Sequence, residues 1–150
     1  MSRWVTLAVF LVLTLGGGLA IGTLAGPDQW FAALQKPAFN PPNWLFAPVW
    51  STLYVLIAIA GWRWWERDSR SIPMALWWLQ LVLNFAWTPI FFSLHAIGAA
   101  LLVIVGLLAV ILIFVATSWR RDRAAAMLFL PYAAWVAFAA VLNAAIYQLN

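Results

Sequence analysis

The chain has no cysteine, a single histidine and few charged residues. Without cysteine it can form neither a disulfide nor a thiolate metal site, and it cannot attach a c-type haem covalently. Charged residues make up 8% of the sequence, whereas 67% of the residues are hydrophobic. Soluble domains carry about a quarter charged residues, so this composition, with a mean hydropathy of +0.96, excludes a soluble globule. It predicts a protein that lies within the membrane.

Charged residues are also missing from five long apolar runs, at about 4–25, 43–62, 72–93, 96–118 and 124–148. Each run has the length of about 20 residues that a helix needs to cross the hydrocarbon layer. We therefore predict an all-α bundle of five transmembrane helices that forms a single domain over residues 1–150. A signal peptide is the alternative for the first run, but that run is longer than a usual signal sequence, and residues 23–25 form a poor cleavage site.

The absence of ionisable side chains from these runs limits the chemistry of the protein. Proton-coupled transporters usually carry such side chains along their path, and general acid/base catalysis needs carboxyl groups in an enclosed site. The four acidic residues lie in the loops instead. We therefore expect neither proton-coupled transport nor acid/base hydrolysis, and with no basic polar face we expect no nucleic-acid partner.

The basic residues are distributed unevenly between the loops. If the five runs alternate across the membrane, seven arginines, in residues 1–3, 63–70 and 120–123, lie on one side, and only Lys36 lies on the other. Basic residues gather on the cytoplasmic side of membrane proteins. We therefore predict a cytoplasmic N-terminus, with the long first loop and the C-terminus on the other side of the membrane.

The first loop, residues 26–42, is too polar and too rich in proline to cross the membrane. The prolines between 37 and 42 prevent a helix before Asn43, which we expect to cap the second transmembrane helix. Within the loop, Asp28 and the aromatic residues after it predict a short amphipathic helix on the membrane surface. Connections of this length are often lids or binding loops, and a passive tether is the alternative.

Three further local features carry expectations about packing. Gly18, Gly22 and Gly26 recur at intervals of four, a spacing that lets membrane helices approach closely, either in a dimer or inside the bundle. Pro89 removes a helical hydrogen bond, so we expect a kink in the outer part of the third helix. His95 falls in a short outer turn with no second metal ligand in reach, and we interpret it as an exposed turn residue and expect no metal site.

Two transmembrane segments carry a stripe of polar and aromatic side chains at helical spacing. The stripe of the third segment contains Trp77, Gln80, Asn84, Trp87, Thr88 and Phe91, and that of the fifth contains Tyr132, Trp135, Ala139 and Asn143. An outward-opening cavity under the long loop would be lined by Trp50, Asn84, Trp87, Trp135 and Asn143 together with the turn at 37–42. Such a cavity would suit a flat, largely apolar ligand with one or two polar groups. The alternative is that the two stripes pack on each other as an amphipathic core.

The remaining tryptophans mostly fall at the ends of the predicted spans. This group contains Trp4, Trp44, Trp62, Trp64, Trp65 and Trp119. Tryptophan is enriched at both membrane–water interfaces, so we interpret these side chains as members of the aromatic belts.

Several motifs resemble one known family. They are Gln35-Lys36-Pro37, Asn40-Pro41-Pro42-Asn43-Trp44, Pro48-Val49-Trp50, Leu53-Tyr54, Leu83-Asn84, Trp87-Thr88-Pro89, Phe91-Phe92, Pro131-Tyr132, Trp135 and Leu142-Asn143. In this order and spacing they closely resemble the TspO/translocator protein family, the tryptophan-rich sensory proteins. The resemblance extends over essentially the whole chain, and the chain is similar to the bacterial members.

The resemblance implies a five-helix bundle, commonly a homodimer, that binds porphyrins in a pocket covered by the first loop and requires no cofactor. The residues that the stripes and the resemblance mark as ligand-binding are Phe31, Pro42, Trp50, Tyr54, Asn84, Trp87, Phe91, Trp135, Ala139 and Asn143. Two departures from the family concern the ligand. Phe31 stands where relatives often have Tyr, and no Lys or Arg follows Tyr147, which argues against a sterol ligand.

Three functions are compatible with this resemblance. The leading hypothesis is a tetrapyrrole-binding protein of the membrane that acts as a sensor, carrier or modulator of porphyrin levels. The second is an enzyme that degrades protoporphyrin in light or by oxidation, in which Trp50 and Trp135 take part. The third is a structural regulator of another membrane protein.

Overall fold

Five long helical spans follow one another along the chain, as the apolar runs predicted. The computed structural model describes all of residues 1–150, and its spans are Arg3–Ala25, Asn43–Asp68, Ile72–Ser93, Ile97–Ser118 and Arg123–Leu149. Each span is long and apolar enough to cross a membrane, so the chain is an all-helical, multi-pass membrane protein. The second span is longer than expected, because its helix continues beyond the apolar run to Asp68.

Local changes of winding divide these spans into shorter elements. In chain order they are α1 (Arg3–Leu11), the π-helical turn η1 (Val12–Gly16), α2 (Gly17–Ala25), α3 (Gln29–Ala33), the 3₁₀ turn η2 (Asn43–Leu45), α4 (Phe46–Asp68), α5 (Ile72–Thr88), the π-helical turn η3 (Pro89–Ser93), α6 (Ile97–Ser118), α7 (Arg123–Leu128) and α8 (Leu130–Leu149). At Pro89 the third span changes to a widened π-helical final turn, in which the backbone N–H of Leu94 donates to the Pro89 carbonyl oxygen. The kink expected at this proline stays a prediction.

Side-chain caps fix the start of several helices. Ser2 and Ser71 each accept a hydrogen bond from the backbone N–H three residues later, at the starts of α1 and α5. The prediction that Asn43 caps the second span is wrong. Asn43 is already the first residue of η2 and its side chain makes no capping bond, because the turn is closed by the backbone bond from Leu45 N–H to the Pro42 carbonyl oxygen, 3.0 Å long.

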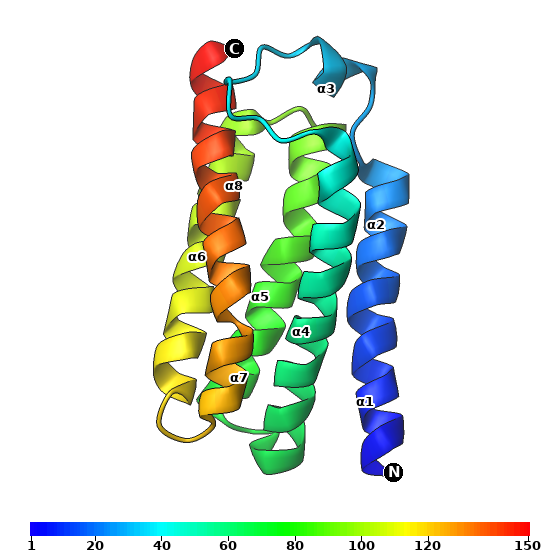
Figure 1. Cartoon of the computed structure of the whole chain (residues 1–150), viewed down its shortest axis with the longest axis vertical. Coiled ribbons are helices and arrows are strands. Elements are labelled where there is room, and N and C mark those ends of the chain that lie inside the picture. The colour runs from blue at the N-terminus through cyan, green and yellow to red at the C-terminus, as the bar shows by residue number, and fades with distance from the viewer.

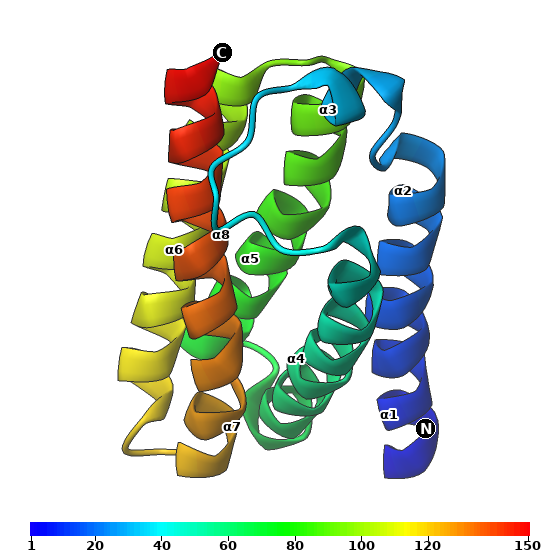
Figure 2. The same ribbon diagram turned by 45° about the horizontal axis from the view of Figure 1, so that its top comes forward.

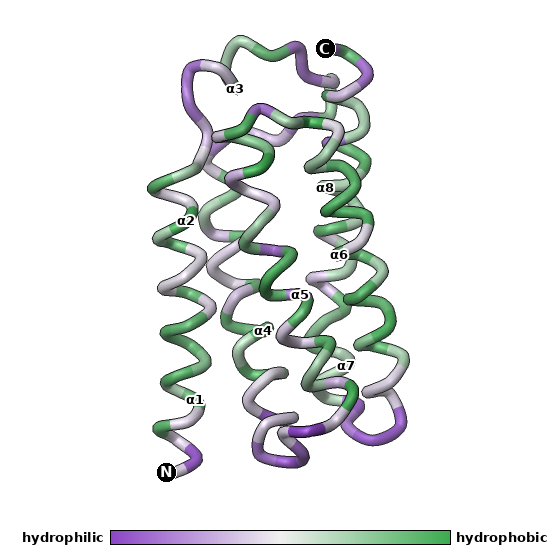
Figure 3. The backbone as a smooth tube through the Cα atoms, turned by 180° about the vertical axis from the view of Figure 1, so that it is seen from behind, coloured by the Kyte–Doolittle hydropathy of each residue, from purple (hydrophilic) through white to green (hydrophobic).

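The spans form a bundle in which α5 and α6 lie behind α4 and α8, while α1 and α2 flank α4 (Figure 1). The N-terminus and the turns before α5 and α7 lie at one end of the bundle, which we call the arginine end. The C-terminus and α3 lie at the opposite end, which we call the loop end. Figure 3 shows hydrophilic backbone concentrated at these two ends, as expected for a bundle that crosses a bilayer. The structure therefore groups the seven arginines apart from Lys36, and the cytoplasmic location of the arginine end stays a prediction.

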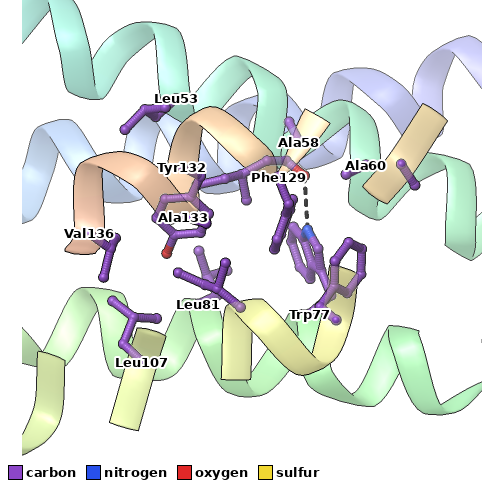
Figure 4. Close-up of a cluster of buried hydrophobic side chains, with 14 of the residues drawn as sticks. Leu53, Ala58, Ala60, Trp77, Leu81, Leu107, Phe129, Tyr132, Ala133 and Val136 are labelled. Atoms are coloured by element: carbon purple, nitrogen blue, oxygen red, sulfur yellow. Dashed lines mark hydrogen bonds between the residues drawn. The ribbon is translucent and has the colours of Figure 1, made fainter. Parts of the chain in front are cut away.

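The main hydrophobic core lies between α4, α5, α6 and α8 (Figure 4). Trp77 is fully buried there, and its indole Nε1–H donates to the Ile57 carbonyl oxygen at 2.8 Å. Gly61 makes this contact possible, since a Cβ atom at that position would overlap the Trp77 ring. Aromatic packing and one satisfied indole N–H therefore hold α5 against α4.

Two tryptophans that we assigned to the interfacial belts are instead buried. Trp62 is 9% exposed and donates to the Arg3 carbonyl oxygen at 2.9 Å, whereas Trp64 is fully buried and donates to Ser118 Oγ at 3.0 Å. Each indole N–H has an acceptor on another span, so it stays hydrogen-bonded although the ring is buried. The other four members of that group, Trp4, Trp44, Trp65 and Trp119, are exposed.

The regularly spaced glycines of the first span do not share one environment. A Cβ atom at Gly18 would overlap the Tyr54 ring, whereas no atom lies within 4 Å of the corresponding position at Gly22. Thr14, one turn before Gly18, donates to the Tyr54 carbonyl oxygen at 2.9 Å. Gly18 thus serves close packing inside the bundle, against α4.

Candidate functional site

The first loop lies over the loop end of the bundle (Figure 2). The predicted short helix is present as α3, and Asp28 caps it by accepting a hydrogen bond from the Phe31 N–H. Phe31 is buried against Phe91 and Phe92, with ring centroids 6.1 and 5.2 Å away. The aromatic residue Phe31 of this helix is thus buried against η3, and the location of the helix on the membrane surface stays a prediction.

Two further contacts hold the middle of the loop. The Gln35 backbone N–H donates to Asn150 Oδ1 at 3.1 Å, and Asn150 Nδ2 donates back to the Gln35 carbonyl oxygen at 2.9 Å. Farther along the loop, the Phe39 ring meets Phe138 of α8 edge-on, with centroids 6.2 Å apart. The loop is thus attached to the last helix by one amide pair and one aromatic contact.

His95 lies beside this loop, in the turn before α6. It is an exposed turn residue, as predicted, and its backbone has a φ of 55° in the left-handed region. Its ring stacks on Trp30, with centroids 4.0 Å apart and planes inclined by 13°. The turn and the start of the loop are therefore in direct contact.

Aromatic pairs connect α4 with α8 at successive levels. The deepest pair is Trp50 with Tyr132, at 6.4 Å between centroids. One turn farther toward the loop end, Phe46 meets Trp135 at 5.9 Å. Both contacts are edge-to-face, and the contact of Phe39 with Phe138 continues the series into the loop. We call these three pairs the aromatic ladder.

A polar network joins three helices below the aromatic ladder. Tyr54 of α4 donates to Asn84 Oδ1 at 2.8 Å, and Asn84 Nδ2 donates to the hydroxyl of Tyr132 at 2.7 Å. Tyr132 in turn donates to Gln80 Oε1 at 2.7 Å. Asn84, Tyr132 and Gln80 are all buried. This network fixes the spacing of α4, α5 and α8 within the bundle.

A second polar pair ties the two stripes together nearer the loop end. Trp87 Nε1 donates to Asn143 Oδ1 at 3.0 Å, and Asn143 Nδ2 donates to the Ile97 carbonyl oxygen at 3.1 Å. The stripes of α5 and α8 therefore pack on each other through hydrogen bonds. At Asn84, Trp87 and Asn143 the structure has the amphipathic core that we gave as the alternative to a cavity.

Two buried donors in this region have no acceptor. They are the indole Nε1–H of Trp135 and the side-chain amide Nε2 of Gln80. Buried polar groups are almost always hydrogen-bonded, so each unpaired donor needs an explanation. Trp135 lies among the rings of Phe46 and Phe138, and its N–H is therefore a buried donor in an apolar, aromatic setting.

The predicted ligand-binding residues divide between two clusters. Trp50, Tyr54, Trp135 and Ala139 pack against the main core, whereas Phe31 and Phe91 belong to a second cluster under α3. Trp87 packs against both clusters and connects them. Pro42 is exposed where the loop enters η2.

Four residues of this region were absent from the predicted ligand-binding set: Phe46, Gln80, Tyr132 and Phe138. Gln80 and Tyr132 lie on the predicted stripes, and their contact with predicted residues could have been inferred from the shared helix face. Phe46 is one helical turn before Trp50, and the same spacing rule could have identified it.

Two clefts lie at the ends of the bundle. The cleft at the loop end has a volume of about 520 Å³ and is lined by residues 22–28 with Phe92, Ser93 and His95. The cleft at the arginine end has a volume of about 350 Å³. Neither is lined by residues of the aromatic ladder, so the cavity expected beneath the loop stays a prediction.

Comparison with known proteins places the whole chain in one group of sequences. The model of the TspO/MBR family matches residues 6–149. The protein CrtK of Rhodobacter capsulatus is 37% identical over 147 residues, which cover 95% of this chain and 91% of that protein. The tryptophan-rich protein TspO of Archaeoglobus fulgidus is 38% identical, covering 95% and 94%, and the translocator protein of Sus scrofa is 38% identical, covering 93% and 86%.

Proposed function

This chain belongs to the TspO/MBR family, and on that premise we propose that it binds a tetrapyrrole between α4 and α8, beneath the first loop. In this role it acts in the membrane as a sensor, carrier or modulator of porphyrin levels. The ligand is a flat, largely apolar macrocycle with peripheral carboxylates. Such a molecule combines faces that stack on aromatic rings with acceptors that take an indole N–H.

The observation that carries this proposal is the unpaired indole N–H of Trp135. It is buried between Phe46 and Phe138, at the middle level of the aromatic ladder. A ligand oxygen at this position would satisfy a donor that the protein leaves without a partner. The rings around it would then supply stacking surface for the macrocycle.

The contacts in the same region indicate how a ligand would enter. The network of Tyr54, Asn84 and Tyr132 holds α4 to α8 below the aromatic ladder and forms the floor of the proposed site. Above it, the two helices meet through edge-to-face rings, which are individually weak contacts of about 1 kcal/mol. Entry of a flat ligand would exchange these contacts for stacking and would lift the loop away from Phe138 and Asn150.

Replacement of the ladder tryptophans tests the proposal. We expect Trp50→Ala and Trp135→Ala each to weaken protoporphyrin binding roughly five- to tenfold, because each removes a stacking surface of about 1 kcal/mol. Titration of detergent-solubilised protein, followed by ligand absorption, measures the affinity. The matched controls are Trp44→Ala and Trp119→Ala, whose rings are exposed, 70% and 39% respectively. If both pairs of variants weaken binding equally, the porphyrin is partitioning into the micelle, and the proposed site is ruled out.

The same titration in light separates binding from degradation. If the protein only binds the pigment, illumination should bleach the complex no faster than it bleaches free protoporphyrin in the same detergent. Faster loss of pigment, abolished by Trp135→Phe, would instead assign an enzymatic function to the same site. A regulator of another membrane protein would show no saturable spectral change at all.

A further inference from the structure

The cleft at the arginine end lies outside the site proposed above and has a different chemistry. Its volume is about 350 Å³, and its lining contains three arginines, two carboxylates and one aromatic ring. These residues are Arg3, Trp62, Arg63, Glu66, Arg67 and Asp122. Together they bring the start of α1 and the end of α4 to one polar hollow at the end of the apolar spans.

Asp122 organises this cleft from within. Its side chain is 2% exposed and accepts from Arg63 Nε and Nη2 at 2.9–3.1 Å, while Arg67 Nε lies 3.8 Å from the same carboxylate. Asp122 also caps α7 by accepting from the Ala125 N–H. The carboxylate is therefore occupied by structural contacts, and it holds two guanidinium groups at the wall of the cleft.

Arg3 also lines the cleft and has no carboxylate partner among the ion pairs of the structure. Its guanidinium lies 5.2 Å from the centre of the Trp62 ring and 5.3 Å from that of Trp4, and the two rings stack on each other. Its carbonyl oxygen accepts the Trp62 indole N–H. The cation is thus positioned by aromatic rings, which leave its N–H groups available to an anion.

We propose that this cleft binds the phosphodiester headgroup of an anionic phospholipid. Arginine is suited to phosphate because its planar set of N–H donors matches two phosphate oxygens, and basic hollows between transmembrane helices bind anionic headgroups. The arginine end carries seven arginines and three carboxylates, an excess of four positive charges that favours anionic over zwitterionic lipid.

The surface beside the cleft fits the rest of such a lipid. Trp4 is 66% exposed and stacks on Trp62 of the cleft lining, so it places an apolar surface beside the cleft. Ala8 and Leu11 follow Trp4 on the same face of the helix and are also accessible, so an acyl chain could lie along this face while the phosphate contacts Arg3 and Arg67. A free phosphate ion would contact only the arginines and would not be stabilised by this apolar face.

Charge-neutral variants of the cleft test the proposal. We expect the double variant Arg3→Gln with Arg67→Gln to weaken binding of dioctanoyl phosphatidylglycerol, about fivefold for each arginine. The matched control, Arg70→Gln with Arg120→Gln, removes the same charge from the same end but alters no cleft residue. Affinity is obtained from the rise of the unfolding temperature in dodecyl maltoside with increasing lipid.

Two comparison ligands distinguish a site for an anionic phospholipid headgroup from a site for free phosphate. Dioctanoyl phosphatidylcholine and inorganic phosphate should each stabilise the protein less than phosphatidylglycerol at the same concentration. Equal stabilisation by inorganic phosphate would show that the cleft binds free anions and not a lipid headgroup. Equal stabilisation by phosphatidylcholine would show that the net charge of the lipid does not determine binding. An equal loss of phosphatidylglycerol affinity in the control variant would mean that the lipid is attracted by the overall positive charge of the arginine end and not by the cleft.

A third variant keeps the proposal testable if the double arginine variant does not fold. Glu66 lines the cleft, is exposed and makes no ion pair in the structure. Because its charge repels phosphate, Glu66→Gln should strengthen phosphatidylglycerol binding severalfold. Unchanged or weaker binding in this variant would overturn the proposal. Protoporphyrin affinity should be the same in all of these variants, since the aromatic ladder lies toward the other end.

Discussion

Replacement of Asn84 by leucine tests the polar network most sharply. Asn84→Leu keeps nearly the same volume and deletes two interhelical hydrogen bonds, from the Tyr54 hydroxyl at 2.8 Å and to the Tyr132 hydroxyl at 2.7 Å. Interhelical hydrogen bonds in membrane proteins contribute about 0.6 kcal/mol on average and at most about 1.7. We therefore expect a loss of roughly 1–3 kcal/mol in the free energy of unfolding.

The assay is reversible unfolding by sodium dodecyl sulfate in mixed micelles, followed by circular dichroism. Thr88→Val is the matched control, because Thr88 lies on the same helix and its side chain makes no hydrogen bond in the structure. That variant should unfold within about 0.5 kcal/mol of the unaltered chain.

The same assay can also test whether the effects of Asn84→Leu and Tyr54→Phe on the free energy of unfolding add up. Once Asn84 is leucine, the Tyr54 hydroxyl has lost its acceptor, so adding Tyr54→Phe should cost less than it does in the unaltered chain. If the two substitutions add fully, or if Asn84→Leu is as stable as the control, the network does not hold the helices. Since both groups of Asn84 are already bonded, we also expect Asn84→Leu to weaken polar and apolar ligands equally.

Two other predictions concern the first span and the loop. Gly18→Val should lower the unfolding midpoint much more than Gly22→Val, because only the first substitution drives a side chain into the Tyr54 ring, and equal midpoints would contradict the packing. Asn150→Ala removes both hydrogen bonds to Gln35, so amide exchange in the loop should accelerate, while unchanged exchange would mean that the loop is held elsewhere.

The spans could be predicted from the sequence because hydrophobic length is a property of a single segment. Transfer of about 20 apolar residues into lipid does not depend on which neighbours they meet. The same holds for α3, where Asp28 caps the helix through a bond to a residue three positions away. The extension of α4 to Asp68 was missed because its last turns lie outside the apolar run.

Contacts between distant residues could not be predicted in this way. Trp64 and Ser118 are far apart in sequence, and their hydrogen bond depends on the rotation and relative height of two helices. A tryptophan near the end of a span has the same local sequence whether it faces headgroups or a partner helix. The burial of Trp62 and Trp64 is therefore a result of packing rather than of position in the span.

The candidate site shows the same division. Helical periodicity correctly placed Asn84 and Asn143 on inward-facing stripes, and both are buried. The pairing of their side-chain atoms with Tyr54, Tyr132 and Trp87 depends on the register of three helices, which periodicity does not determine. The sequence consequently indicated which residues are near the site but not which of their donors stay unpaired.

The most direct test of tetrapyrrole binding is a crystal structure of the protein with zinc protoporphyrin, in which the anomalous signal of the metal locates the ligand. The account predicts the macrocycle between α4 and α8, against Trp50 and Trp135, with a ligand oxygen within hydrogen-bonding distance of the Trp135 indole nitrogen. Residues 34–42 of the loop should be displaced from Phe138. A macrocycle bound only on the lipid-facing surface, with the aromatic ladder intact, would contradict the proposed function.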